Sequence, residues 1–272
     1  MGSPRIAKHD TKKIVRGVLH REAPDELAVE EPLEIRIDDE PVTVTMRTPG
    51  DDFDLAAGLL RTEGIFTSPE QIGSMRYCGD EKDPAYRNVI NVTPATGVRL
   101  DLSKLKRNFY TSSSCGVCGK SAIENIRTEA KPLNGKHRVK LEVFYMLGAA
   151  LRKAQTVFEK TGGLHAAGIF DLNGTLLALR EDIGRHNATD KAIGRMFIER
   201  KLPLDKHILM VSGRASFEIV QKCLMAGVPI VCAVSAPSSL AVEFALEAGM
   251  TLVGFLRADQ FNIYSGAERI EV

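Results

Sequence analysis

The sequence lacks tryptophan and is poor in aromatic residues of any kind, which make up 6% of its 272 residues. It has no apolar run long enough to cross a bilayer, so nothing in it predicts a membrane protein. Its formal net charge is only +1, because 36 Lys and Arg offset 35 Asp and Glu. A protein that binds nucleic acid through the phosphate backbone needs a positive excess, so this balance argues against that class.

Cysteine is also scarce, since the chain holds only five. An odd number in a chain of this length argues against a disulfide framework, and the polar stretch Met1–Arg16 holds no signal-peptide core. Both features predict a cytoplasmic protein in a reducing compartment. Cys78 lies in a predicted loop, Cys223 in a predicted helix and Cys232 in a predicted apolar strand, and all three are expected to be inert.

The other two cysteines, Cys115 and Cys118, form a CxxC motif within the segment Thr111–Lys120. Serine and glycine around them allow access and offer no packing, and a helical pattern follows at Ser121–Ile126. A thiol at a helix N-terminus is favoured as the thiolate, which attacks sulfur, binds metal or carries a persulfide. The motif alone leaves metal binding, dithiol redox chemistry and sulfur transfer open.

The first half of the chain predicts a flexible arm over residues 1–20 and a small α+β domain over residues 21–110. A helix is expected at Phe53–Leu60, because apolar residues recur there with helical spacing and Gly64 follows. Alternating sequences predict the strands Leu33–Ile37, Val42–Met46, Asn88–Val92 and Val98–Leu100. The CxxC loop, its short helix and a linker occupy residues 111–136.

The second half, residues 137–272, alternates helices with apolar strands. The predicted helices are Leu141–Lys160, Ala188–Arg200, Ala215–Ala226 and Ser239–Ala248. The predicted strands are Leu164–Asp171, Thr175–Leu179, Ile208–Val211, Ile230–Val234 and Thr251–Phe255. Continuous apolar strands separated by helices indicate a sheet covered on both faces. The fold prediction is therefore α/β: a three-layer α/β/α sandwich with a mixed, mostly parallel sheet. Its element order resembles the cytidine deaminase fold.

Small, hydroxyl-rich turns follow the first two of the last three predicted strands, and Phe255–Gln260 follows the third. Ligands of open α/β sheets bind beyond the carboxyl ends of the strands. Free backbone N–H groups at such turns bind anions, and Arg214 and Arg257 add bidentate donors. We therefore predict phosphate binding here, whereas helix capping alone would explain only the serines. The candidate residues are Ser212, Gly213, Arg214, Ser235, Ser238, Ser239, Phe255, Leu256, Arg257, Ala258, Asp259 and Gln260.

A second polar cluster spans Arg180–Lys191 and includes Arg185 and His186. It lies between the predicted second hairpin strand and the next helix. A solvated charged turn and a functional loop are both consistent with it. His165 begins a predicted strand, where a core role and a functional role are equally open.

The possible chemistries differ in what they require. Zinc deamination needs a Glu two residues after the metal-binding His or Cys and a downstream Pro-Cys-x-x-Cys. Here His165 is followed by two alanines and the CxxC lies upstream, so we reject that activity. A structural zinc would need a complete tetrahedral ligand set, and no second CxxC is present. A thioredoxin-like motif normally lies in a βαβ unit, whereas this CxxC precedes the predicted α/β half, which argues against dithiol redox chemistry of that type. Sulfur transfer needs one accessible, acidic thiol, and a second thiol can help release the sulfur.

Five segments together resemble the FdhD family of formate dehydrogenase accessory sulfurtransferases. They are Ser113–Gly119, Gly162–Ala167, Glu181–Lys191, Ser212–Glu218 and Val234–Ala241. The resemblance implies that a cysteine desulfurase loads sulfur on Cys115 as a persulfide, with Cys118 as the second thiol. The sulfur then passes to the bis-molybdopterin guanine dinucleotide cofactor, which is bound as a substrate, before that cofactor enters formate dehydrogenase.

The resemblance also implies where the cofactor binds and which partners the protein binds. The family's cofactor-contacting stretch matches Phe255–Gln260, although Ala258-Asp259-Gln260 departs from a pattern richer in Arg and Gly. We add His165, Arg185 and His186 to the expected cofactor-binding set. The expected partners are a cysteine desulfurase, the catalytic subunit of formate dehydrogenase, the guanine nucleotide cofactor and a second copy of the chain, with no permanent metal. The alternatives are a cofactor-binding chaperone that moves no sulfur and a zinc hydrolase.

Overall fold

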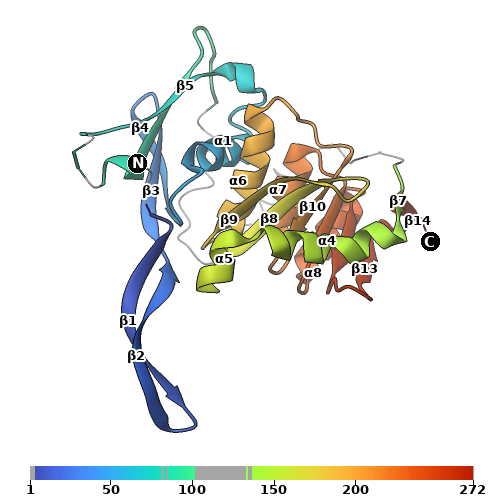
Figure 1. Ribbon diagram of the computed structural model, residues 1–272. Coiled ribbons are helices and arrows are strands. Elements are labelled where there is room, and N and C mark those ends of the chain that lie inside the picture. The colour runs from blue at the N-terminus through green and yellow to red at the C-terminus, as the bar shows by residue number, and fades with distance from the viewer. Residues whose placement is uncertain (1–3, 81, 84, 102–132, 134–136, 272) are drawn as a thin grey trace.

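The computed structural model describes residues 4–80, 82–83, 85–101, 133 and 137–271. Cys115, Cys118, the helix predicted at Ser121–Ile126 and the predicted boundary at residue 110 lie outside these residues. The described chain comprises a projecting β-hairpin, a region built on a four-stranded sheet and a larger region built on a six-stranded sheet (Figure 1).

The hairpin consists of β1 (Ile6–Val15) and β2 (Val18–Ala28), and it extends away from the rest of the molecule (Figure 1). Arg16 and Gly17 form its turn with φ values of 50° and 81°, the left-handed backbone that two-residue hairpin turns need. Residues 6–20 of the predicted arm therefore belong to a paired ribbon, and the boundary predicted at residue 20 falls inside β2.

The four-stranded sheet has the order β4-β3-β6-β5 and packs against helix α1 (Asp52–Thr62). Its strands are β3 (Glu31–Ile37), β4 (Glu40–Arg47), β5 (Ile72–Tyr77) and β6 (Val89–Pro94), and the short 3-10 helices η1 (Pro69–Gln71) and η2 (Tyr86–Asn88) lie beside it. The helix and three predicted strands are confirmed. The strand predicted at Val98–Leu100 is wrong, because those residues join no sheet, and β5 was not predicted.

The six-stranded sheet has the order β13-β12-β11-β10-β8-β9. Its strands are β8 (His165–Asp171), β9 (Leu176–Asp182), β10 (His207–Val211), β11 (Ile230–Ala233), β12 (Thr251–Gly254) and β13 (Asn262–Ser265). Strands β9 to β12 run in one direction, and β8 and β13 run against them. The mixed sheet is as predicted, apart from β13. A small parallel pair, β7 (Val139–Lys140) with β14 (Ile270–Glu271), and the 3-10 helix η3 (Ala267–Arg269) complete the region.

Helices cover both faces of this sheet, which confirms the three-layer α/β/α prediction. Ile208 and Met210 of β10 share a core with helix α4 (Leu141–Ala154). The alternate residues Leu209 and Val211 share the opposite core with helices α6 (Arg185–Ile198), α7 (Phe217–Ala226) and α8 (Ser239–Glu247). This alternation is what a strand buried on both faces requires.

Two helix boundaries differ from the prediction because polar groups from β9 intervene. The helix predicted at Leu141–Lys160 is interrupted at Gln155, and α5 (Thr156–Thr161) begins anew there. The Glu181 carboxylate accepts hydrogen bonds from the backbone N–H groups of Val157 and Phe158, at 3.0 and 2.8 Å, and so caps the new helix. Helix α6 begins at Arg185 and not at Ala188, so most of the predicted charged turn belongs to β9 and α6.

The two regions meet where α1 crosses α6 (Figure 1). Gly58 of α1 and Gly194 of α6 lie at the crossing. A Cβ atom at Gly58 would overlap the carbonyl oxygen of Asp190, and one at Gly194 would overlap that of Asp54. The two helix backbones are therefore in direct contact, which fixes the four-stranded region against the six-stranded one.

Candidate anion-binding site

Three loops at the carboxyl ends of β10, β11 and β12 lie side by side and are hydrogen-bonded to one another. Ser235 N donates to Gly213 O at 3.3 Å, Ser238 N donates to Ala215 O at 3.0 Å, and Phe255 N donates to Ser235 O at 3.2 Å. The strand-end residues predicted to hold a ligand are thus brought together along one edge. We define the rim as these loops, residues 212–216, 235–239 and 255–260, together with His165, Arg185 and His186.

His165 reaches this edge because β8 runs antiparallel to β10, so the first residue of β8 lies beside the end of β10. A Cβ atom placed on Gly213 would lie 3.2 Å from the His165 Nδ1, so a larger residue here would require the imidazole to shift by a few tenths of an ångström. Partial burial and the electrostatic influence of Arg185, His186 and Arg214 lower the pKa of His165. The neutral imidazole is therefore favoured at the rim.

Arg185 and His186 form the first turn of α6, which begins where β9 ends at the same edge. His186 Nε2 lies 3.0 Å from Ser216 Oγ and 2.8 Å from Glu218 Oε2. The hydrogen bond from His186 holds the pKa of Glu218 below its usual range. These contacts tie α6 to the start of α7 and thereby to the loop that carries Arg214.

The arginines of the rim differ in whether their guanidinium groups find hydrogen-bond acceptors within the protein. Arg214 is exposed, and its side chain makes no hydrogen bond or ion pair within the described residues. The same holds for Arg185, whose Nε is buried without a partner. Arg257 instead donates from Nη1 to the carbonyl oxygens of Val234 and Leu256, at 2.6 and 2.9 Å. A buried donor without an acceptor is costly, so Arg185 suits phosphate oxygens supplied from outside, and the exposed, unpaired guanidinium of Arg214 is also free to bind them.

The serines of the rim have separate roles. Ser238 caps α8 by accepting a hydrogen bond from Ala241 N at 3.2 Å, as the capping interpretation predicts. Ser212 Oγ accepts one from Ala166 N at 2.9 Å and so links β8 to β10, while the Ser216 hydroxyl binds His186. Ser239 is exposed at the start of α8. Helix capping therefore accounts for one of these serines and not for the group.

The segment after β12 forms a tight turn, in which Arg257 N donates to Gln260 O at 2.9 Å. Leu256 is buried, whereas Ala258, Asp259 and Gln260 are exposed. Phe255 has a φ of 53° and remains 41% exposed. A left-handed aromatic residue is uncommon, and such strain is concentrated at functional sites. Its ring provides an exposed aromatic surface at the rim.

Comparison with known proteins identifies the family of this chain and several of its relatives. The model of the FdhD/NarQ family matches residues 28–271. The chain belongs to the FdhD/NarQ family. It is 52% identical over 252 residues to the sulfur carrier protein FdhD of Mycolicibacterium paratuberculosis, covering 91% of this chain and 92% of the relative. It is 50% identical to the sulfur carrier protein FdhD of Streptomyces coelicolor, covering 91% and 89%. The resemblance predicted from the motifs is confirmed.

A crystal structure shares the fold of this FdhD/NarQ family member. It is that of a protein from Desulfotalea psychrophila described as a formate dehydrogenase accessory protein, and it superposes with a TM-score of 0.79. The match covers 98% of this chain and 100% of the other, at 24% sequence identity. At this level of identity the likeness establishes the fold and no more.

The charged cluster that this family member carries at Arg180–Lys191 is largely buried, so the solvated-turn interpretation is wrong. Lys191 Nζ lies 2.7 Å from Asp182 Oδ2, and both side chains are completely inaccessible. Sequence reasoning did not assign them a place in the site. A signal was present, since Lys191 falls between Ala188 and Ala192 on the apolar stripe of α6.

The described cysteines of this family member are not rim residues. Burial raises the pKa of Cys223 and Cys232, which stabilises their neutral thiols, and Cys78 follows β5 in the other sheet. Within the described residues, no cluster of three metal-ligating side chains occurs. No helix in that part of the chain is both long and apolar enough to cross a membrane.

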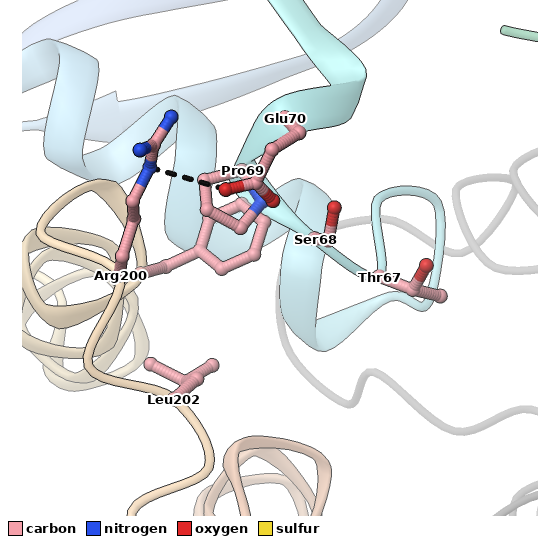
Figure 2. A pocket seen from close by; sticks show the side chains of 7 residues that line it. Thr67, Ser68, Pro69, Glu70, Arg200 and Leu202 are labelled. Atoms are coloured by element: carbon pink, nitrogen blue, oxygen red, sulfur yellow. Dashed lines mark ion pairs between the residues drawn. The ribbon is translucent and has the colours of Figure 1, made fainter.

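A separate hollow of about 210 Å³ lies at the far end of α6 (Figure 2). It is lined by Thr67, Ser68, Pro69, Glu70, Phe197, Arg200 and Leu202. Arg200 Nε pairs with Glu70 Oε1 at 3.1 Å, and both side chains are largely exposed. Its arginine is thus already neutralised by the protein, in contrast to those of the rim.

Proposed function

We propose that this protein is a sulfur carrier that takes sulfane sulfur from a cysteine desulfurase as a persulfide on Cys115. It delivers that sulfur to the bis-molybdopterin guanine dinucleotide cofactor held at the rim, for activation of formate dehydrogenase. The observation that carries the proposal is the rim itself, where Arg185 and Arg214 lack protein partners in the described part of a chain whose relatives are named sulfur carriers. We place the protein in the reducing cytoplasm as a homodimer.

The thiol assignment follows from the state of the described cysteines. Cys223 and Cys232 are buried with raised pKa values, so neither can present a thiolate to another protein. Cys78 lies in the four-stranded region, away from the rim. The carrier role is therefore assigned to the CxxC motif, in which Cys115 matches the persulfide-bearing position of the family.

The chemistry of loading is a thiolate–persulfide exchange. The Cys115 thiolate attacks the outer sulfur of the donor persulfide, a new S–S bond forms, and the donor cysteine leaves as a thiolate. Attack of the Cys118 thiolate on the inner sulfur then releases the outer sulfur as sulfide and leaves a Cys115–Cys118 disulfide. The two electrons needed to reduce sulfane sulfur come from the two thiols, so delivery itself needs no other reductant.

The rim suits the charged and aromatic parts of this substrate. The guanidinium groups of Arg185 and Arg214 can donate to pyrophosphate oxygens in bidentate fashion. Phe255 exposes a ring on which a guanine base can stack. His165, with its lowered pKa, adds a neutral polar group that can donate or accept a hydrogen bond.

The test is sulfur loading followed by intact-protein mass spectrometry. Wild-type protein incubated with a cysteine desulfurase and cysteine should gain the mass of one sulfur atom, and peptide mapping should place it on Cys115. Cys115→Ala should abolish the gain, whereas the control Cys78→Ala should retain it. Loading of Cys115→Ala at the wild-type level would rule the carrier assignment out.

A cofactor-binding chaperone that moves no sulfur is the second candidate, because the cations of the rim would suffice for binding without any thiol. The two functions separate when both motif cysteines are replaced. A chaperone would still support formate dehydrogenase maturation with Cys115→Ala and Cys118→Ala combined. A sulfur carrier would not, although its rim would still bind the cofactor.

A further inference from the structure

The junction between β9 and α6 is built around one buried carboxylate. Asp182, the last residue of β9, accepts hydrogen bonds from Thr48 N at 3.1 Å, Gly184 N at 2.8 Å and Asn187 Nδ2 at 3.2 Å. Its fourth partner is the ammonium group of Lys191, at 2.7 Å. All four groups around this carboxylate are therefore donors.

The end of β4 closes the other side of the same junction. Lys191 Nζ donates to Thr48 O at 2.7 Å, and Ile183 N donates to Thr48 Oγ1 at 3.3 Å. Asn187 Nδ2 also donates to Met46 O, at 2.7 Å. We call Thr48, Asp182, Asn187 and Lys191 the clamp. It joins the four-stranded region to the turn that precedes α6.

The clamp brackets the two rim residues of α6. Arg185 and His186 lie in the chain directly between Gly184 and Asn187, both of which bind Asp182. Within the described residues the Arg185 side chain has no hydrogen bond or ion pair, and its Nε is buried. An arginine without side-chain partners is placed mainly by its backbone, and that backbone is held by the clamp.

We propose that Asp182 and Lys191 are positioning residues for the rim, and that the four-stranded region contributes to anion binding through Thr48 without touching the anion. This inference rests on the proposed function, in which the rim holds the phosphate groups of the substrate. A buried ion pair adds little net stability compared with apolar residues, but it can specify one geometry. Here the geometry specified is that of the first turn of α6.

The chemistry of the junction makes the idea testable with an isosteric change. In Asp182→Asn the amide has one acceptor oxygen and one NH₂ group. The NH₂ group must then face a donor, either Thr48 N–H or Gly184 N–H, so the turn has to shift. Replacing Lys191 with Met as well removes the unpaired buried charge, and this should restore stability without restoring the lost acceptor.

The experiment measures binding of inorganic pyrophosphate to the full-length protein by isothermal titration calorimetry, alongside thermal unfolding. Asp182→Asn should weaken pyrophosphate binding at least about tenfold, the effect of losing about one charged hydrogen bond. Asp182→Asn with Lys191→Met should unfold near the wild-type temperature and still bind weakly. The milder Thr48→Val should weaken binding severalfold in a well-folded protein.

The matched control is Asp190→Asn, on the same helix. Asp190 is also buried and paired, with Lys222 Nζ at 2.8 Å and Thr62 Oγ1 at 2.8 Å, but it contacts no rim residue. This variant should lose stability and keep full affinity when measured well below its unfolding temperature. If affinity follows stability across all variants, or if Thr48→Val and the double variant bind as wild type does, the positioning role is wrong. No binding to wild-type protein would instead refute the anion site itself, and this inference with it.

Discussion

Arg47 at the end of β4 and Arg185 at the start of α6 show two opposite uses of a partly or wholly buried guanidinium. Arg47 is 0% exposed and donates to both carboxylate oxygens of Asp52, at 3.0 and 3.2 Å, and to Glu31 at 3.1 Å. Arg185 has a buried Nε and no side-chain partner within the described residues. The same side chain is saturated by protein acceptors in one region and left unsatisfied in the other.

This contrast distinguishes charged groups that stabilise the fold from charged groups that are free to bind a ligand. Burial alone would not do so, because Lys191 and Asp182 are as deeply buried as Arg47. Arg185 differs from them in its missing acceptor, and an unsatisfied donor costs stability unless something outside the protein satisfies it. Arg61 Nε in α1 is also buried without a partner among the described residues, so what marks Arg185 for a ligand is this missing acceptor together with its position beside the strand-end loops. Changes to Arg47 should therefore affect folding, and changes to Arg185 should affect binding.

The largest expected effect is that of Arg47→Met on stability. The substitution leaves the Asp52 carboxylate buried without its bidentate partner, so the free energy of unfolding should fall by about 3–5 kcal/mol. Urea denaturation of the two proteins measures the difference. A loss below about 1 kcal/mol would mean that the Arg47 cluster behaves like an exposed ion pair, and the comparison with Arg185 would fail.

Arg185→Met should have the opposite profile. Because Arg185 makes no ion pair or hydrogen bond in the described part of the chain and its buried Nε lacks an acceptor, the free energy of unfolding should not fall, and removal of that unsatisfied donor should raise it by about 1 kcal/mol. Pyrophosphate affinity should fall about tenfold or more, since a charged hydrogen bond contributes about 1.5–3 kcal/mol. Calorimetric titration of the same samples tests the predicted affinity, and urea denaturation tests the predicted stability.

The control for Arg185 is Arg195→Met on the same helix. Arg195 is exposed, pairs with Glu199 one turn away and lies outside the rim, so its removal should leave pyrophosphate affinity unchanged. Equal losses of affinity in the two variants would show that only general charge matters, and the idea of a built anion site would then be abandoned.

The sequence predicted the rim better than it predicted the clamp, and the reason is physical. Residues such as Ser212, Ser235 and Phe255 directly follow apolar strands, and the strand-end rule brings such positions to one edge whatever the side chains are. Thr48 and Asp182 are far apart in the chain and meet only because α1 crosses α6 at two glycines. No pattern within a short stretch of sequence predicts a contact between residues so far apart in the chain.

The same reasoning explains the errors in secondary structure. Strands β1 and β2 are polar, and most of their described side chains are partly or fully exposed, so neither shows the alternation of a half-buried strand. The helix break at Gln155 depends on Glu181, which arrives from another strand. The motifs identified the family without any of this information, because they are local in sequence. The thiols themselves, Cys115 and Cys118, remain predictions.

The smallest expected effect is a change in pH dependence when His165 is replaced. Partial burial and the neighbouring Arg185, His186 and Arg214 lower the pKa of His165, with Asp182 opposing them. The unfolded chain therefore binds more protons at this site than the folded chain does between the lowered pKa and about pH 6.5, the ordinary histidine value. The stability contributed by neutral His165 is thus present above about pH 6.5 and is lost as the pH falls through that window.

His165→Gln removes the titration while keeping a polar side chain beside Gly213. Wild-type protein should lose stability more steeply than the variant as the pH falls below about 6.5, measured by urea denaturation at closely spaced pH values. His207 also has a pKa lowered by burial, but it is present in both proteins and cancels in the difference. Parallel pH profiles would mean that His165 titrates as freely as it does in the unfolded chain. Neither partial burial nor the positive charges of Arg185 and Arg214 would then act on the imidazole, and the rim would carry less local positive potential than its unpaired arginines imply.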